Sequence, residues 1–248
     1  MELPERAAAF RDGWLRLNPG FEYRFYDDDA CRRLVEETVP QHLAAYLAFP
    51  HAVMRADFFR YAALYRHGGL YADIDMECVR PMAPLRELAP AVLGVEAHLT
   101  ARRQRELDYA RPAQIANSIM LSSPGHGFFL EAMAQCAAEA AARGQIPRSQ
   151  IEDVTGPRML TRLFYARPRG DIVVLRQTVL APPRHYPDFW PLNRRVHARH
   201  HFFGSWKATE RKPFARRWVE RDLWPNPFGR GLVERRLTPA AQQGSPAA

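Results

Sequence analysis

Apolar residues recur along the chain at spacings that predict two long helices. In residues 1–17 and again in HAVMRADFFRYAALYRHGG (residues 51–69), they fall three or four positions apart, which is typical of helices that bury one side. Turn residues close both segments, because an Asn-Pro-Gly run occupies 18–20 and a glycine pair occupies 68–69. Both helices are therefore expected before residue 70.

Short apolar runs bounded by turn residues predict the strands, and further periodic segments predict more helices. Strands separated by helices indicate a layered α/β domain. We expect strands at 21–26, 70–72, 91–96, 115–121 and 172–175, and helices at 31–38, 127–143, 160–166 and 214–223.

The length and composition fit one soluble domain. With 248 residues and 47% hydrophobic content, the chain can bury a substantial core. We expect a single domain over 1–239 and a disordered tail over 240–248. No apolar run reaches the roughly 20 residues needed to cross a bilayer, and MELPERAAAF does not resemble a signal peptide, so a cytoplasmic protein is expected. Three scattered cysteines, at 31, 78 and 136, read as reduced thiols.

A formal charge of +8 suggests an anionic partner but does not identify it. One alternative is a non-catalytic, basic nucleic-acid-binding protein that uses Arg102, Arg103, Arg105 and the segment 211–236. Acids such as Glu106 interrupt these arginines, which favours a solvated surface. The segment 211–236 also carries tryptophans, so it is a candidate for peripheral contact with an anionic membrane.

Asp73 and Asp75 are the strongest candidates for chemistry. They follow an apolar, glycine-preceded strand, so both carboxylates can lean toward one cation while Ile74 points into the core. A divalent ion held there would stabilise the departing diphosphate of a nucleotide sugar. An alternative is a metal-dependent phosphohydrolase in which Glu77 is a further carboxylate.

Asp57 and Arg60 lie three positions apart on the preceding helix and can therefore pair. An ordinary structural ion pair explains this spacing. A functional use is also open, in which Arg60 binds phosphate or a sugar hydroxyl and Asp57 accepts hydrogen bonds from hydroxyls.

Five segments together resemble the DxD sugar-transfer family, glycosyltransferase family 32, which includes fungal initiating mannosyltransferases and bacterial capsule enzymes. The longest is RADFFRYAALYRHGGLYADIDMECVRPM. The other four are NPGFEYRFYDDDAC, which precedes it, and IANSIMLSSPGHGFF, VTGPRML and HHFFGSW, which come after it. All five segments occur in the family's order over residues 14–206.

The resemblance implies a role for each matching residue. Asp73, Asp75 and Asn117 correspond to the catalytic positions, with Asn117 near the reacting sugar. Asp75 and Asp73 would bind Mn²⁺ or Mg²⁺, and His201, or less favourably His200, would complete the metal shell. The residues implied to bind the donor are Asp57, Arg60, Tyr71, Ser205 and Trp206.

The resemblance also implies a fold and a reaction. The expected fold is a GT-A-like α/β domain with a central mixed, mostly parallel sheet flanked by helices. The expected reaction moves a hexosyl unit from a nucleoside diphosphate sugar to a hydroxyl acceptor, with retention, in polysaccharide or glycolipid synthesis. The acceptor would be a glycan or lipid-linked glycan, and the enzyme would work in the bacterial cytoplasm or at the inner membrane face. Family members usually begin with an extra apolar strand, which this sequence is expected to lack.

Overall fold

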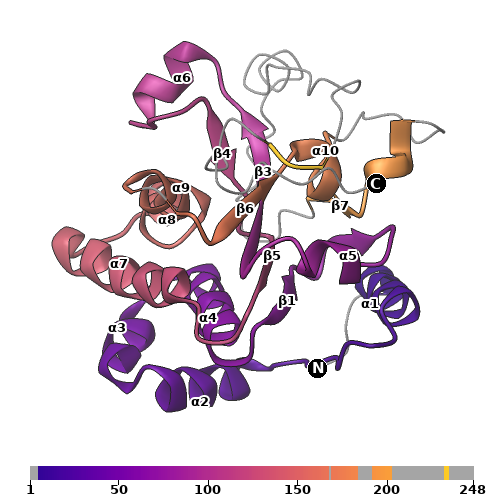
Figure 1. Ribbon diagram of the computed structural model, residues 1–248. Helices are drawn as coiled ribbons and strands as arrows, with labels where there is room; N and C mark the ends of the chain where they lie inside the picture. Colours follow the sequence, from indigo (N-terminus) through magenta and orange to yellow (C-terminus); the bar gives the residue numbers. More distant parts are fainter. Residues whose placement is uncertain (1–4, 168, 184–191, 203–231, 235–248) are drawn as a thin grey trace.

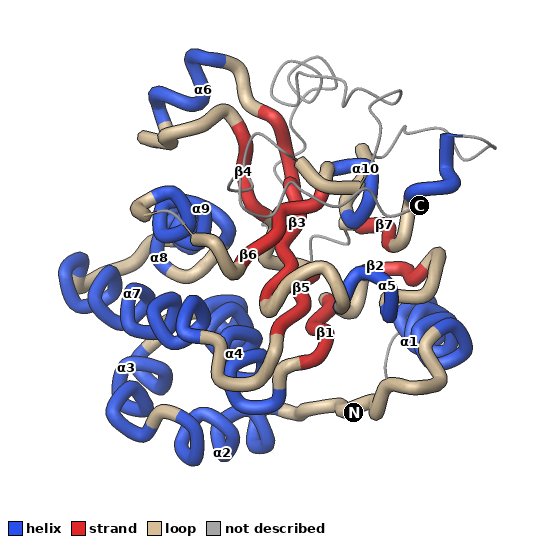
Figure 2. The backbone as a smooth tube through the Cα atoms, in the orientation of Figure 1, coloured by secondary structure: helices blue, strands red, loops and turns tan. Residues whose placement is uncertain are grey.

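The fold is an α/β domain with helices on both sides of a central sheet (Figure 1, Figure 2). A computed structural model describes residues 5–167, 169–183, 192–202 and 232–234. The long helices begin and end close to where the sequence predicts them. They are α1 (Glu5–Leu17), α2 (Asp28–Thr38), α4 (Ala52–His67), α7 (Gly127–Arg143) and α9 (Pro157–Tyr165). Shorter helices are α3 (Leu43–Ala48), α5 (Ala83–Arg86), α6 (Ala101–Glu106), α8 (Ile151–Val154) and α10 (Gln177–Leu180), with single 3₁₀ turns at Pro40–His42, Arg148–Gln150 and Leu192–Arg195.

The central sheet has five strands in the order β1-β5-β3-β4, with β6 paired to β3. The strands are β1 (Gly69–Ala72), β3 (Ala91–His98), β4 (Ala113–Ile115), β5 (Ile119–Ser122) and β6 (Ile172–Leu175). A separate antiparallel ribbon joins β2 (Met76–Cys78) to β7 (Ala198–His200).

The predicted mixed sheet flanked by helices is confirmed, but the expectation that it is mostly parallel is wrong. Among the described strands of this sheet, β3 and β6 run parallel, whereas β1–β5, β3–β5 and β3–β4 are antiparallel. The parallel pair has the long crossover that such pairs need, because the chain between β3 and β6 includes α7, α8 and α9.

Alternate residues of the central strands separate two apolar cores. Leu93 and Val174 face a core with α2, α3, α4, α7, α8 and α9, whereas Val92 and Val173 face a core with α5, α10 and the β2–β7 ribbon. Such near-continuous apolar strands are typical of sheets covered on both faces. Figure 1 shows α4 and α7 on one side of the sheet and α1 and α5 on the other.

Two strand predictions fail. Residues 21–26 form no strand among the described residues, and the predicted strand 115–121 is interrupted at 116–118 between β4 and β5. The amide of Ala116 donates to Gly94 O at 2.8 Å, and Ser118 O accepts from Asp73 N at 2.9 Å. Both bonds continue the register of the neighbouring strand pairs, β3–β4 and β1–β5, and the strand is interrupted where its register against β3 shifts between Val95↔Ile115 and Val92↔Leu121. The buried Asn117 therefore lies next to the end of β1.

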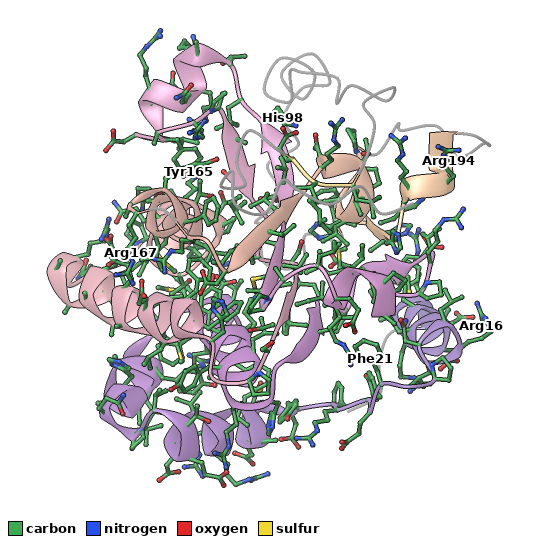
Figure 3. All side chains as sticks on the ribbon, viewed as in Figure 1. Arg16, Phe21, His98, Tyr165, Arg167 and Arg194 are labelled. Carbon is green, nitrogen blue, oxygen red and sulfur yellow. The ribbon has the colours of Figure 1, made fainter. Side chains whose placement is uncertain are left out.

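Basic residues occur at several places on the described part of the chain. In Figure 3 the labelled Arg16, Arg167 and Arg194 lie at separate places on the periphery. Arg102 and Arg103 both pair with Glu106, at 3.2 and 3.0 Å, as expected for a solvated helix face. No helix in the described ranges has the length and apolar content to span a membrane.

Candidate active site

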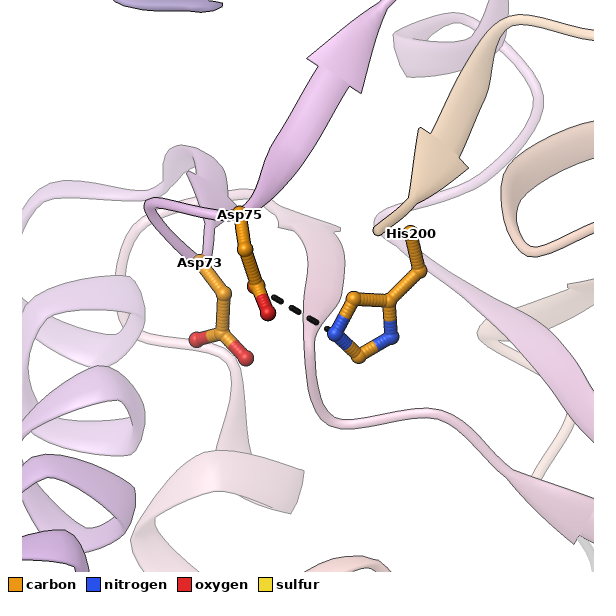
Figure 4. A group of neighbouring side chains, drawn as sticks. All are labelled: Asp73, Asp75 and His200. Carbon is orange, nitrogen blue, oxygen red and sulfur yellow. Dashed lines mark ion pairs between the residues drawn. The ribbon is translucent and has the colours of Figure 1, made fainter. Parts of the chain in front are cut away.

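The two aspartates lie in a tight turn that connects β1 to β2. The amide of Met76 donates to Asp73 O at 2.9 Å, so the chain reverses direction within three residues. This turn breaks the strand alternation, and Ile74 is 58% exposed instead of buried. The expected inward position of Ile74 is therefore wrong, whereas the convergence of Asp73 and Asp75 holds (Figure 4).

His200 joins the aspartates from the other strand of the ribbon. Strand β7 pairs with β2 in the register Met76↔His200, so the imidazole of His200 reaches the turn. The Nε2 atom of His200 lies 3.3 Å from Asp75 Oδ1. One possible ligand atom from each of Asp73, Asp75 and His200 lies within 4.8 Å of the others (Figure 4). His200 Nδ1 is buried and has no hydrogen-bond partner among the described residues.

His201, which we expected to complete the metal shell, lies elsewhere. Its Nε2 is 2.8 Å from Glu77 Oε2, and its Nδ1 faces Arg6 Nη2 at 3.1 Å. Its ring also packs against Phe10 of α1, with centroids 4.6 Å apart. Successive residues of an extended chain point to opposite sides, so only one of the two histidines can face the turn. The structure brings His200, rather than His201, to the aspartates.

Arg60 connects helix α4 to the turn. Its Nη2 lies 2.9 Å from Asp57 Oδ1 and its Nη1 lies 3.0 Å from Asp73 Oδ1. Its Nη1 also donates to Asn117 O at 2.7 Å, and its guanidinium lies 4.9 Å from the centre of the Tyr71 ring. The Asp57–Arg60 pair expected from the sequence is thus confirmed, and it continues to the turn that carries Asp73 and Asp75.

Tyr71 and Asn117 hold the carboxylates of the same network. The Tyr71 hydroxyl donates to Asp73 Oδ1 at 2.8 Å. The side-chain amide of Asn117 donates to Asp57 Oδ1 at 3.0 Å. Asn117 reaches Asp57 because the interruption between β4 and β5 lies at the end of β1.

Thr155 also belongs to this network, although the sequence did not predict a role for it. Its hydroxyl donates to Asp57 Oδ2 at 2.9 Å, and the residue is fully buried. Tyr61 of α4 donates to Thr155 O at 2.8 Å. The available signal was the segment VTGPRML, in which a polar residue precedes Gly-Pro at the start of a helix.

Burial and charge set the ionisation of the pair on α4. Burial raises the pKa of Asp57 to about 6, although Arg60 and the bonds from Thr155 and Asn117 oppose that rise. Burial alone would lower the pKa of Arg60. The charges around it, above all that of Asp73, have the larger effect, so the pKa of Arg60 is raised above its ordinary value. Arg60 therefore stays charged, and Asp57 is mostly ionised at neutral pH.

Two predicted donor-binding residues, Ser205 and Trp206, lie outside the described residues. The candidate site therefore consists of the described side chains at the end of β1. They are Asp57, Arg60, Tyr71, Asp73, Asp75, Asn117, Thr155 and His200.

Residues 4–91 match a family model described as the glycosyltransferase sugar-binding region containing the DXD motif. This range contains Asp57, Arg60, Tyr71, Asp73 and Asp75. Its match supports the interpretation of the turn, since the two aspartates are the motif in its name.

Curated relatives agree with this match. Inositol phosphoceramide mannosyltransferase 3 of Schizosaccharomyces pombe is 31% identical over 130 residues, which are 52% of this chain and 32% of that protein. The initiation-specific alpha-1,6-mannosyltransferase of Candida albicans is 28% identical over 145 residues, which are 53% and 37% of the two chains. The chain thus spans about a third of the length of these relatives. These two relatives are fungal, whereas the resemblance seen in the sequence also implied bacterial capsule enzymes.

Among solved structures, the PaToxG glycosyltransferase aligns with a TM-score of 0.46 and 16% identity, over 67% of this chain and 65% of that one. The DXD-motif match and the curated mannosyltransferase relatives show that part of this chain resembles the DXD-containing sugar-binding region of glycosyltransferases.

Proposed function

We propose that this protein moves a hexosyl unit from a nucleoside diphosphate sugar to a hydroxyl acceptor and that it needs Mn²⁺ or Mg²⁺. One observation carries the proposal: the ligand atoms of Asp73, Asp75 and His200 lie within 4.8 Å of one another, with Arg60 paired to Asp73. The match of residues 4–91 to the sugar-binding region of DXD-motif glycosyltransferases supports sugar transfer as the class of reaction.

The residues present fit a divalent cation. Two carboxylates and one imidazole form a donor set acceptable to Mn²⁺, and the buried, unpaired Nδ1 of His200 leaves the imidazole with unused bonding capacity among the described residues. When bound, the ion supplies positive charge that stabilises the departing diphosphate.

Arg60 supplies a second, permanent positive charge. Its Nη atoms are engaged with Asp57, Asp73 and Asn117, whereas its buried Nε has no hydrogen-bond partner among the described residues. That N–H is available to a phosphate or sugar oxygen. The surrounding bonds fix the guanidinium before substrate arrives, so little reorganisation is needed as charge develops on the leaving group.

The donor, the acceptor and the location are part of the same proposal. Relatives are named as mannosyltransferases, two of them acting on inositol phosphoceramide by name, which favours a mannosyl donor and a lipid-linked or glycan acceptor. We propose transfer with retention, in the cytoplasm and at the inner membrane face. Membrane contact would use residues 211–236, most of which lie outside the described residues. Sedimentation with liposomes, with and without anionic lipid, tests that contact, and equal binding to both would contradict it.

The test of the donor site is thermal unfolding with a panel of UDP and GDP sugars, with and without Mn²⁺. We expect one nucleotide to raise the melting temperature of the wild type only with metal, since ligand at 100-fold its Kd adds about 2.7 kcal/mol. Asp75→Asn should abolish the rise. Glu77→Gln is the matched control, because Glu77 pairs with His201 outside the metal cluster, and it should respond like the wild type.

The same samples separate transfer from phosphohydrolase chemistry. A transferase releases a nucleoside diphosphate in proportion to acceptor, whereas a phosphohydrolase splits the diphosphate with water into a nucleoside monophosphate and a sugar phosphate without one. Release of the monophosphate that depends on Glu77 would overturn the proposal. The absence of any metal-dependent nucleotide response in the wild type would overturn it as well.

A further inference from the structure

The turn between α8 and α9 reaches the donor site through one side chain. Thr155 lies in Val154-Thr155-Gly156-Pro157, and the amides of Thr155 and Gly156 both donate to Ile151 O, at 3.0 and 3.3 Å. Tyr61 fixes the same turn from α4 by donating to Thr155 O. The backbone of this turn is thus held from both sides.

Glycine at position 156 permits this approach. A Cβ there would lie 2.8 Å from Glu152 Cα and 3.5 Å from Asp57 Oδ2. The first of these distances is shorter than real Cβ contacts, so any side chain would force the turn away from Glu152 of α8 and disturb its approach to Asp57. The close packing brings the Thr155 hydroxyl within hydrogen-bond distance of Asp57.

The two carboxylate oxygens of Asp57 have different partners. Oδ1 receives Arg60 Nη2 and the Asn117 amide, whereas Oδ2 receives the Thr155 hydroxyl. Among the described residues no other hydrogen bond to Oδ2 is present. Loss of the hydroxyl would leave a buried carboxylate oxygen unpaired and free the carboxylate to rotate.

We propose that Thr155 is a positioning residue of the donor site, which fixes the Asp57 carboxylate and, through it, the Arg60 guanidinium against Asp73. The effect can pass along this chain because Arg60 divides its two Nη atoms between Asp57 and Asp73, at 2.9 and 3.0 Å. A planar guanidinium cannot turn toward one carboxylate without changing its contact with the other. The consequence for sugar transfer rests on the proposed function, whereas the coupling of Thr155 to Asp73 does not.

A double-mutant cycle tests the coupling without any ligand. Unfolding of the full chain by urea is measured for Thr155→Val, Asp73→Asn and the double variant. We expect the two changes to deviate from additivity by at least about threefold in the unfolding equilibrium constant, since coupled residues commonly show such deviations. Thr161→Val is the control, because its buried hydroxyl bonds Ile115 N and Pro157 O rather than Asp57, and it should be additive with Asp73→Asn.

Donor affinity at saturating Mn²⁺ is the second readout. Thr155→Val should bind the nucleotide sugar about tenfold more weakly than the wild type, which corresponds to about 1.4 kcal/mol. Thr155→Ser, which keeps the hydroxyl, should restore binding. Thr161→Val should lose stability but keep donor affinity.

The two readouts distinguish failure of this inference from failure of the proposed function. Additive effects of Thr155→Val and Asp73→Asn overturn the positioning role, and so does unchanged donor affinity in Thr155→Val. If the wild type binds no nucleotide sugar, the proposed function fails, and the cycle still decides the role of Thr155. Should Thr155→Val not fold, Thr155→Cys, a weaker donor, takes its place under the same criterion.

Discussion

The Nε2 atom of His200 lies 3.3 Å from Oδ1 of Asp75, so the strand β7, near the end of the described chain, closes the turn that follows β1. The β2–β7 ribbon fixes this meeting by its register. Helix α1 braces the ribbon from outside, because the Trp14 indole donates to Met76 O at 2.8 Å. The metal-binding candidates therefore depend on strand pairing between distant segments.

Replacement of each of the two adjacent histidines by alanine should distinguish their roles. We expect His200→Ala to weaken Mn²⁺ binding about tenfold or more, because it removes one of the three proposed ligands at the turn. His201→Ala should change the affinity by less than about threefold, since that side chain binds Glu77 and Arg6. Titration followed by the electron paramagnetic resonance of free Mn²⁺ measures both. Equal losses in the two variants would contradict the assignment of His200.

Removal of Arg60 should be costly for the fold itself. Arg60→Met leaves the carboxylate of Asp57, whose side chain is 6% exposed, without its buried counter-charge. We expect the free energy of unfolding at pH 7 to fall by about 3–5 kcal/mol, as for other broken buried pairs. Urea denaturation measures the change. Addition of Asp57→Asn to Arg60→Met should recover part of the loss, because the unpaired charge is then gone. No recovery would show that the pair contributes through packing alone.

The sequence predicts those parts of the fold that depend on local signals. Helix α7 and strand β6 have the predicted bounds, because apolar periodicity and flanking turn residues define them. The interruption at residues 116–118 lies inside the apolar run 115–121, so no local signal marks it. It lies where the register of this segment against β3 shifts between Val95↔Ile115 and Val92↔Leu121, and that shift depends on pairing between distant segments.

The same distinction between local sequence signals and tertiary contacts applies to the candidate site. The pairing of Asp57 with Arg60 follows from helix spacing. The convergence of Asp73 and Asp75 is predicted from strand alternation but arises from the turn at residues 73–76. The choice between His200 and His201 depends on the register of β7 against β2, which a single sequence does not reveal. Thr155 carries no charge and acts through a contact between distant segments, so composition and spacing do not identify it.

A glycine at the end of α4 should matter through one close contact. Gly68 has φ of +64°, and a Cβ there would lie 2.6 Å from Pro124 N. Gly69 has φ of +79°, but a Cβ there would meet no atom within 4 Å. Both alanine variants pay the cost of positive φ, about 1 kcal/mol or more, and Gly68→Ala should lose additional stability from the clash. Thermal unfolding of the two variants compares them, and equal losses would show that the backbone yields at Gly68.

The raised pKa of Asp57 should make stability depend on pH with a definite sign. Because this pKa is about 6 in the folded protein and about 3.9 in an unfolded chain, the folded state binds an extra proton between those values. Stability rises with pH only where the unfolded state binds more protons, so the contribution of Asp57 must decrease as pH increases from about 4 to 6. The wild type should therefore lose stability across this window relative to Asp57→Asn.

Urea denaturation at several pH values measures this difference, and the comparison with Asp57→Asn cancels the other titrating groups. Asp12→Asn is the control, since Asp12 is an exposed carboxylate of α1 whose removal should leave the dependence on pH close to that of the wild type. A difference that grows in the opposite direction would mean that Arg60, Thr155 and Asn117 together outweigh burial and hold the pKa of Asp57 below that of an unfolded chain. Arg60 would then be anchored through the whole pH range, and donor binding should not weaken as pH falls through 6.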